Sequence, residues 1–122
     1  MAKSKFTPGV EEWAKSVYNS VFGKNVPDEF AELFNHWVEE LENGNLSFEA
    51  FVENAVFSKY VDDKNLSNKE FLDLLYKIME VKKPTDYDFW YSKFETRSRK
   101  GVLNGLFLTE NWAKFCGKYE VN

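Results

Sequence analysis

The sequence predicts an all-α protein that folds as a single compact domain, 1–122, of about six or seven helices. Apolar residues recur three and four positions apart along most of the chain, and no segment alternates polar and apolar residues as a half-buried strand would. Helix caps and Gly or polar turns separate these segments. At 122 residues, the chain has the length of one ordinary domain.

Three helices are expected in the first half. Thr7 is the expected cap of the first helix, Pro8 takes its first position, and Gly23 ends it. A proline turn opens the second helix, which ends around Gly44, and Ser47 caps the third. The expected inward-facing residues are Val10, Trp13, Val17 and Val21, then Phe30, Leu33, Phe34, Trp37 and Leu41, then Phe48, Phe51, Val52 and Ala55.

Further helices are expected after a polar stretch at 62–65. Ser67 and Glu70 have the spacing of a capping box, and Thr85 and Asp88 repeat that spacing. A short helix follows the basic stretch 97–100, and Thr109 caps the last helix. The expected inward-facing residues are Phe71, Leu74, Leu75 and Ile78, then Tyr87, Trp90, Tyr91 and Phe94, then Val102, Leu103, Leu106 and Phe107, then Trp112, Phe115, Cys116 and Tyr119.

Landmark residues recur along the chain in the same order, at a spacing that falls from 58 to 51 residues. The simplest alternative is that any two amphipathic helices resemble each other, but ordered landmarks exceed what periodicity requires. We therefore predict two diverged copies of a three-helix unit, at about 10–61 and 67–116, which pack together because neither buries its aromatic stripe alone. The pairs are Trp13 with Phe71, Tyr18 with Tyr76, Pro27 with Pro84, Trp37 with Trp90, Leu41 with Phe94, Ser58 with Thr109 and Val61 with Trp112.

The repeated unit resembles a known family. Its landmarks are Trp13, Tyr18, Gly23-Lys24, Pro27-Asp28, Trp37, Leu41, Gly44 and Ser58 in copy one, and Phe71, Tyr76, Lys82, Pro84, Trp90, Phe94 and Thr109–Trp112 in copy two. This order resembles the bacterial domain of unknown function four-two-one-four, whose fold is similar to the phycobilisome linker domain. Val81-Lys82 departs from the Gly-Arg turn of that family. The resemblance implies a non-catalytic binding or assembly module of surface or exported proteins, with a surface polysaccharide or a protein as partner.

Compartment and oligomeric state remain open at this stage. The single cysteine, Cys116, excludes an internal disulfide and a Cys-based zinc site. No apolar run approaches the roughly 20 residues of a membrane span, and the first residues lack the apolar stretch of a secretory signal. We expect a cell-surface location if the chain is a domain of an exported protein, and a cytoplasmic one if it is complete.

Charge is distributed unevenly over a net charge of −4. Residues 1–61 carry five Lys against nine Glu and one Asp, which argues against nucleic acid as a partner. Glu29, Glu32, Glu39 and Glu40 are expected to form an acidic face on the second helix. That face motivates an alternative function, a small free-standing acidic regulator or inhibitor that binds one protein.

The basic group Lys93, Arg97, Arg99 and Lys100 is the candidate site for an anionic glycan or a phosphate, and holds both arginines of the chain. The alternative is an ordinary solvated loop. The four tryptophans lie on stripes expected to face inward, so we expect them in the core rather than stacked on a sugar.

No enzymatic activity, metal or cofactor is predicted. The only histidine, His36, has no nucleophile pattern around it, and no glycine loop of the phosphate-binding kind is present. Placing Gly44 at the sixth position of a calcium loop puts Leu41 third and Ala50 twelfth, where oxygen ligands are required.

Overall fold

Helices account for every regular element of the computed structural model, which describes residues 8–121. Apart from the four-residue α4, seven α-helices occur in this range, so the predicted all-α fold is confirmed. The elements are α1 (Pro8–Phe22), η1 (Asp28–Phe30), α2 (Ala31–Glu42), α3 (Phe48–Val56), α4 (Lys59–Asp62), α5 (Asn68–Ile78), α6 (Tyr87–Ser92), η2 (Lys93–Glu95), α7 (Arg99–Leu106) and α8 (Glu110–Lys118), where η marks a 3-10 helix.

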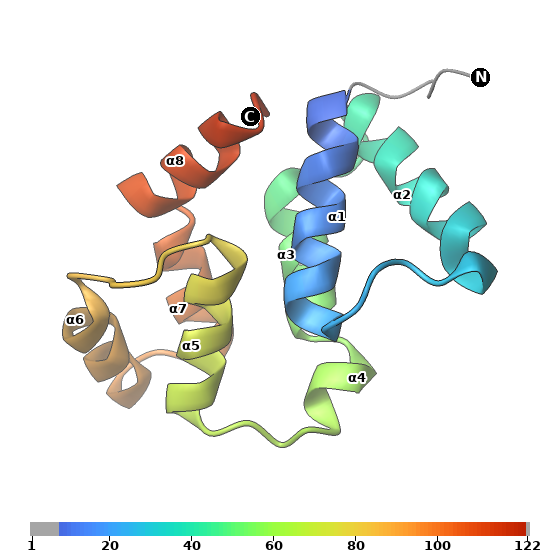
Figure 1. Ribbon diagram of the computed structural model, residues 1–122. Coiled ribbons are helices and arrows are strands. Elements are labelled where there is room, and N and C mark those ends of the chain that lie inside the picture. The colour runs from blue at the N-terminus through green and yellow to red at the C-terminus, as the bar shows by residue number, and fades with distance from the viewer. Residues whose placement is uncertain (1–7, 122) are drawn as a thin grey trace.

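Helix α1 stands in the middle of the molecule, with α2 and α4 on one side and α5 to α8 on the other (Figure 1). It contacts α2, α3 and α5. Trp13 is fully buried, and its ring lies 4.9 Å from that of Phe48, 6.1 Å from Trp112 and 5.8 Å from Phe115. Both halves of the chain, α1–α4 and α5–α8, therefore share one aromatic core.

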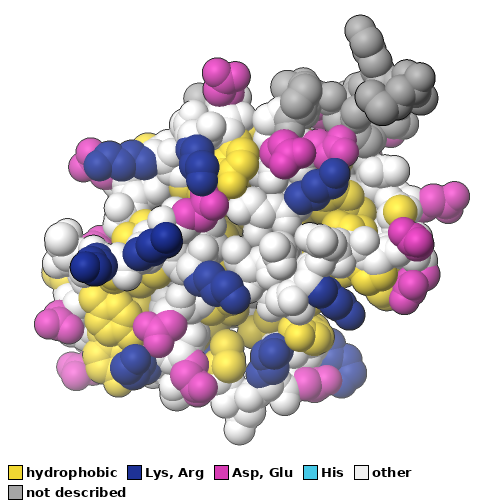
Figure 2. Space-filling view, viewed as in Figure 1, with side chains coloured by type: hydrophobic (Ala, Val, Ile, Leu, Met, Phe, Trp, Pro, Cys, Tyr) yellow, Lys and Arg dark blue, Asp and Glu magenta, His cyan; other side chains and the backbone are white. Residues whose placement is uncertain are grey.

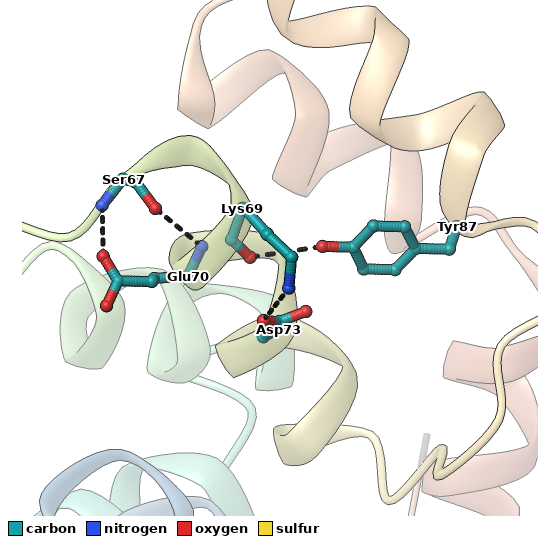
Figure 3. Close-up of polar contacts among 5 residues, drawn as sticks. All are labelled: Ser67, Lys69, Glu70, Asp73 and Tyr87. Carbon is teal, nitrogen blue, oxygen red and sulfur yellow. Dashed lines mark hydrogen bonds and ion pairs between the residues drawn. The ribbon is translucent and has the colours of Figure 1, made fainter.

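The predicted capping box at the start of α5 is confirmed (Figure 3). Ser67 Oγ accepts the Glu70 amide at 3.1 Å, and Glu70 Oε1 accepts the Ser67 amide at 2.9 Å. The hydrogen bond from that amide lowers the pKa of Glu70. In the same view the Tyr87 hydroxyl donates to the Lys69 carbonyl at 3.4 Å, which connects α6 to the first turn of α5.

The second predicted capping box, Thr85 with Asp88, is wrong. Helix α6 begins at Tyr87 with Asp86 as its N-cap, and no side chain caps it. The Asp86 carboxylate is engaged elsewhere, because it accepts the Tyr76 hydroxyl at 2.7 Å and Trp90 Nε1 at 3.1 Å. The Thr7 cap predicted for α1 lies outside the described residues.

Four residues predicted to face inward are exposed: Phe30 (47%), Leu33 (47%), Trp37 (37%) and Tyr91 (46%). The buried side of α2 is formed instead by Phe34, Val38 and Leu41, at the spacing of a single helical face. Leu33 and Trp37 lie one position before buried residues, so they project to the flank of that face. The prediction of an inward stripe was too wide for a helix covered on one side.

Local contacts repeat at the helix junctions of the two halves. Ser47 and Ser98 each accept the backbone amide three residues on, at 3.0 and 3.1 Å. Ser58 and Thr109 each donate to the carbonyl three residues back, at 2.7 and 2.6 Å. Helix α4 forms after Ser58, where a Ser-started tail was expected, so the first half contains four α-helices, α1 to α4.

Candidate functional site: an apolar pocket beside Trp37

A pocket of about 360 Å³ opens in the first half, between the end of α1, the middle of α2, and α3 with the residues that flank it. This volume lies at the lower end of the range for small-molecule sites, roughly 300–1,000 Å³. Its lining residues are Tyr18, Phe22, Trp37, Leu46, Phe51, Asn54, Ala55 and Ser58.

Aromatic rings fix the walls of the pocket. Tyr18 and Phe22 lie one turn apart on α1, with ring centroids 4.6 Å apart. Phe22 also packs against Tyr60 at 5.0 Å, and the Tyr60 hydroxyl donates to the Phe22 carbonyl at 3.3 Å. On the other side, the Trp37 ring meets Phe51 edge to face at 6.2 Å. These ring contacts hold the aromatic walls of the pocket against their neighbours.

Few polar groups reach the pocket. The Ser58 hydroxyl donates a hydrogen bond to the Ala55 carbonyl, while Asn54 is exposed. Burial raises the pKa of Tyr18, with further contributions from the charge of Glu29 and from Tyr60. The site therefore offers apolar surface, one phenol, one amide and a nearby negative charge, which suits binding of a ring with few hydrogen bonds.

The predicted basic group is partly used inside the molecule. Arg99 donates to Asn68 Oδ1 at 3.0 Å and to the Leu66 carbonyl at 2.6 Å, and its guanidinium lies 5.1 Å from the Phe71 ring centroid. These contacts connect α7 to the start of α5, so the Arg99 side chain contributes to the packing of these two helices.

The other three members of the basic group contact different residues from those that Arg99 contacts. Lys100 forms an ion pair with Glu53 at 3.1 Å, and Lys93 lies 4.6 Å from the Phe89 ring centroid. Arg97 is exposed and lies against α7. Binding of an anionic glycan or phosphate by this group stays a prediction.

The predicted acidic face spreads along α2. Glu29, in η1, and Glu32, in the first turn of α2, are exposed, whereas Glu39 and Glu40 are half-buried near the end of α2. At 1.5 Å per helical residue the two pairs are about 10–15 Å apart. The face shown in Figure 2 mixes acidic and basic side chains, and apolar surface gathers over α6, where Phe89 and Tyr91 are exposed.

Other reactive groups lie outside the pocket. His36 is exposed on α2. Burial raises the pKa of the Cys116 thiol to about 11, which keeps it protonated and unreactive. Among residues 8–121, no group of three side chains is placed to hold a metal ion, and no helix is long and apolar enough to cross a membrane.

Comparisons with protein-family models, curated proteins and solved structures find no match to this chain. The resemblance to domain of unknown function four-two-one-four thus stays a prediction.

The sequence patterns did not predict this pocket. Its signal was the position of Trp37, which comes directly before Val38 of the buried Phe34–Val38–Leu41 face. A large aromatic one step off a helical stripe is poorly covered by a single neighbouring helix, and it marks a flank where a cavity can form.

Proposed function

We propose that this protein is a non-catalytic binding module that receives an apolar group of its partner in the pocket beside Trp37. The observation that carries the proposal is the preformed aromatic cavity next to exposed apolar side chains. Leu33 and Trp37 lie one turn apart on α2 and are 47% and 37% exposed. A pocket flanked by exposed large apolar groups is typical of an interaction site.

The titratable groups support binding rather than catalysis. Of the described groups with clearly shifted pKa values, Tyr18 alone lines the pocket, and burial is the main cause of its shift. The raised pKa values of Tyr76 and Cys116 arise mainly from burial in the core, and that of Lys118 from its contact with Glu80. Within residues 8–121, no pair of ionisable groups with opposed pKa shifts faces this pocket, in contrast to sites of acid–base chemistry.

The proposal includes the internal repeat, with 10–61 and 67–116 as diverged copies. Support comes from the matched contacts of Ser47 with Ser98 and of Ser58 with Thr109, both pairs 51 residues apart. A second match is the ring contact of Tyr18 with Phe34 at 6.1 Å, beside that of Tyr76 with Tyr87 at 5.8 Å. The bacterial surface setting, with a protein or surface polysaccharide as partner, belongs to the same proposal.

A titration of the ¹⁵N-labelled protein with simple sugars, aromatic amides and aliphatic amides tests the binding role. We expect at least one class to shift the indole N–H signal of Trp37 and the side-chain amide signal of Asn54. Ala55→Leu places a larger side chain in the pocket and should abolish these shifts. Ala113→Leu, on the exposed side of α8, is the matched control and should retain them. Shifts that survive Ala55→Leu, or none with any class, would overturn the proposal.

A small acidic regulator that binds one protein is the second candidate, and the exposure of Glu29, which acts electrostatically on Tyr18, and of Glu32 favours it. Charge reversal at these two residues, with the pocket intact, separates the candidates. Capture of a partner protein that Glu29→Lys/Glu32→Lys abolishes and Ala55→Leu leaves unchanged would support the regulator. The opposite pattern would support the pocket.

A further inference from the structure

We propose that the pocket beside Trp37 seats the indole ring of a tryptophan side chain from a partner protein, with Lys or Arg next to that tryptophan. This inference rests on the proposed binding role and on the proposed pairing of the two halves. Its basis is a difference between the halves: the second half fills the corresponding space with an indole of its own.

Trp90 is that internal indole. It corresponds to Trp37 at a spacing of 53 residues, the same spacing that relates Tyr87 to Phe34. Only 9% of Trp90 is exposed, against 37% of Trp37. Asp86 holds the Trp90 ring in place, because it accepts Trp90 Nε1 at 3.1 Å and the Tyr76 hydroxyl at 2.7 Å.

A glycine lets Trp90 lie so deep. A Cβ added to Gly105 would stand 2.5 Å from Trp90 Cζ3 and 2.6 Å from Cη2, so the ring rests on bare backbone of α7. The 51-residue spacing fixed by the Ser47/Ser98 and Ser58/Thr109 contacts places Asn54 at the position of Gly105. Asn54 has a Cβ there, and Trp37 stays at the edge of the pocket.

The remaining lining follows the same pairing. Arg97 corresponds to Leu46, and its Nη1 lies 3.3 Å from the position of a Cβ on Gly105, so Arg97 helps to cover that space. Leu46 at the corresponding position leaves the first-half pocket open and apolar. Tyr76 donates its hydroxyl to Asp86, whereas the Tyr18 hydroxyl makes no hydrogen bond to another described residue and can accept an incoming indole N–H.

Charge around the pocket selects the neighbours of the incoming tryptophan. Glu29 is exposed and close enough to Tyr18 to affect it electrostatically. Residues 1–61 carry five Lys against nine Glu and one Asp, so a cationic segment is attracted to this half and an acidic one is repelled.

Binding of blocked peptides to the intact chain tests the inference. The probes are Lys-Trp-Lys, Lys-Leu-Lys and Glu-Trp-Glu, with affinities measured from the Trp37 and Asn54 NMR signals. We expect Lys-Trp-Lys to bind about threefold to tenfold more tightly than Lys-Leu-Lys, from the added ring contacts. We expect an advantage of about twofold to fivefold over Glu-Trp-Glu, which Glu29→Gln should reduce.

Asn54→Gly gives the first half a glycine at the position that corresponds to Gly105, and it is the most direct test. It should let Trp37 move into the pocket, reduce the exposure of Trp37 and abolish peptide binding. Asn104→Gly, an exposed asparagine within α7, is the matched control for the helix-weakening effect of glycine and should bind normally.

The outcomes separate the inference from the proposed function. Equal binding of the Trp and Leu peptides, or pocket shifts with sugars alone, overturns the tryptophan seat and leaves the binding module standing. Retained binding by a folded Asn54→Gly protein also overturns the seat. Absence of pocket shifts with any probe overturns both.

Discussion

At the residue scale, Trp37 and Trp90 differ in exposure and in the residue that lies beside the indole ring. Trp90 is 9% exposed and lies on Gly105, where no Cβ intervenes. Trp37, of the same residue type, is 37% exposed and lies beside Asn54 at the rim of a pocket. The proposed pairing of the two halves attributes this difference to the Cβ of Asn54, since a close-packed interior does not let a Cβ and an indole ring occupy the same space.

We expect Gly105→Ala to displace the Trp90 ring. The added methyl group forces a shift that costs about 1–3 kcal/mol of unfolding free energy, against a gain of about 1 kcal/mol from replacing a helical glycine, so the net loss is up to about 2 kcal/mol. Urea unfolding measures the loss, and the Trp90 indole signal reports the shift. Gly117→Ala in α8 has open space around the new Cβ and should instead stabilise the protein by about 0.5 kcal/mol. Equal effects of the two substitutions would contradict the packing argument.

Tyr76, which is buried and hydrogen-bonded to Asp86, should make the free energy of unfolding fall at alkaline pH. Burial, with the hydrogen bond to Asp86, raises the pKa of Tyr76 above its ordinary value of 10.0. The unfolded chain then loses the phenolic proton at a lower pH than the native protein. Stability from this group is therefore complete below about pH 10 and falls above it, by about 1.4 kcal/mol per pH unit for one proton. Tyr76→Phe should flatten the fall in unfolding free energy between pH 10 and 11, and an unchanged slope would refute the assignment.

At the element scale, helix starts were predicted best where their signals are local. Ser47, Ser67 and Thr109 cap helices as expected, because their hydroxyl groups bond to amides three residues away. The start of α6 was not predictable in this way, since the Asp86 carboxylate accepts the Tyr76 hydroxyl and the Trp90 indole N–H and caps no backbone amide of its helix. Local rules hold until a tertiary partner takes the capping group.

The α5 capping box sets the stability of a helix that packs against α1. Ser67→Ala removes the bond to the Glu70 amide and should lower the unfolding free energy by about 1 kcal/mol. Ser20→Ala, within α1, replaces a serine by a better helix former and is the control, with little or no loss expected. Both are measured by urea unfolding followed by circular dichroism. A loss no greater than that of the control would show that the box contributes nothing.

The candidate site shows why sequence patterns stop short of function. The stripe on α2 was predicted as one broad inward face, yet Phe34, Val38 and Leu41 alone are buried there. Coverage of a helix depends on how many neighbours it has, and a sequence does not show that α2 lies at the side of the molecule. The basic group was read from sequence proximity, but Arg99 and Lys100 point to different partners, Leu66 and Glu53.

At the scale of the whole molecule, the two halves depend on each other through α1. Trp13 contacts rings from α3 in its own half and from α8 in the other, and α1 contacts α5. The buried side chains of residues 8–121 form one cluster that draws on both halves. Neither half then retains a complete core once the other has opened, because its central rings lose most of their partners.

Unfolding is therefore expected as one transition for both halves. The indole signals of Trp37 and Trp90 report the first and second half, and their urea midpoints should coincide. Trp13→Ala removes ring contacts to both halves and should lower the free energy of unfolding by about 3–5 kcal/mol. Both midpoints should fall together, since the lost contacts belong to the shared core. Leu108→Ala, at a residue 90% exposed, is the control and should leave both midpoints unchanged. Separate midpoints for Trp37 and Trp90 would mean that the halves fold independently, and the contact of α1 with α5 would then be a docking surface between two units rather than part of one core.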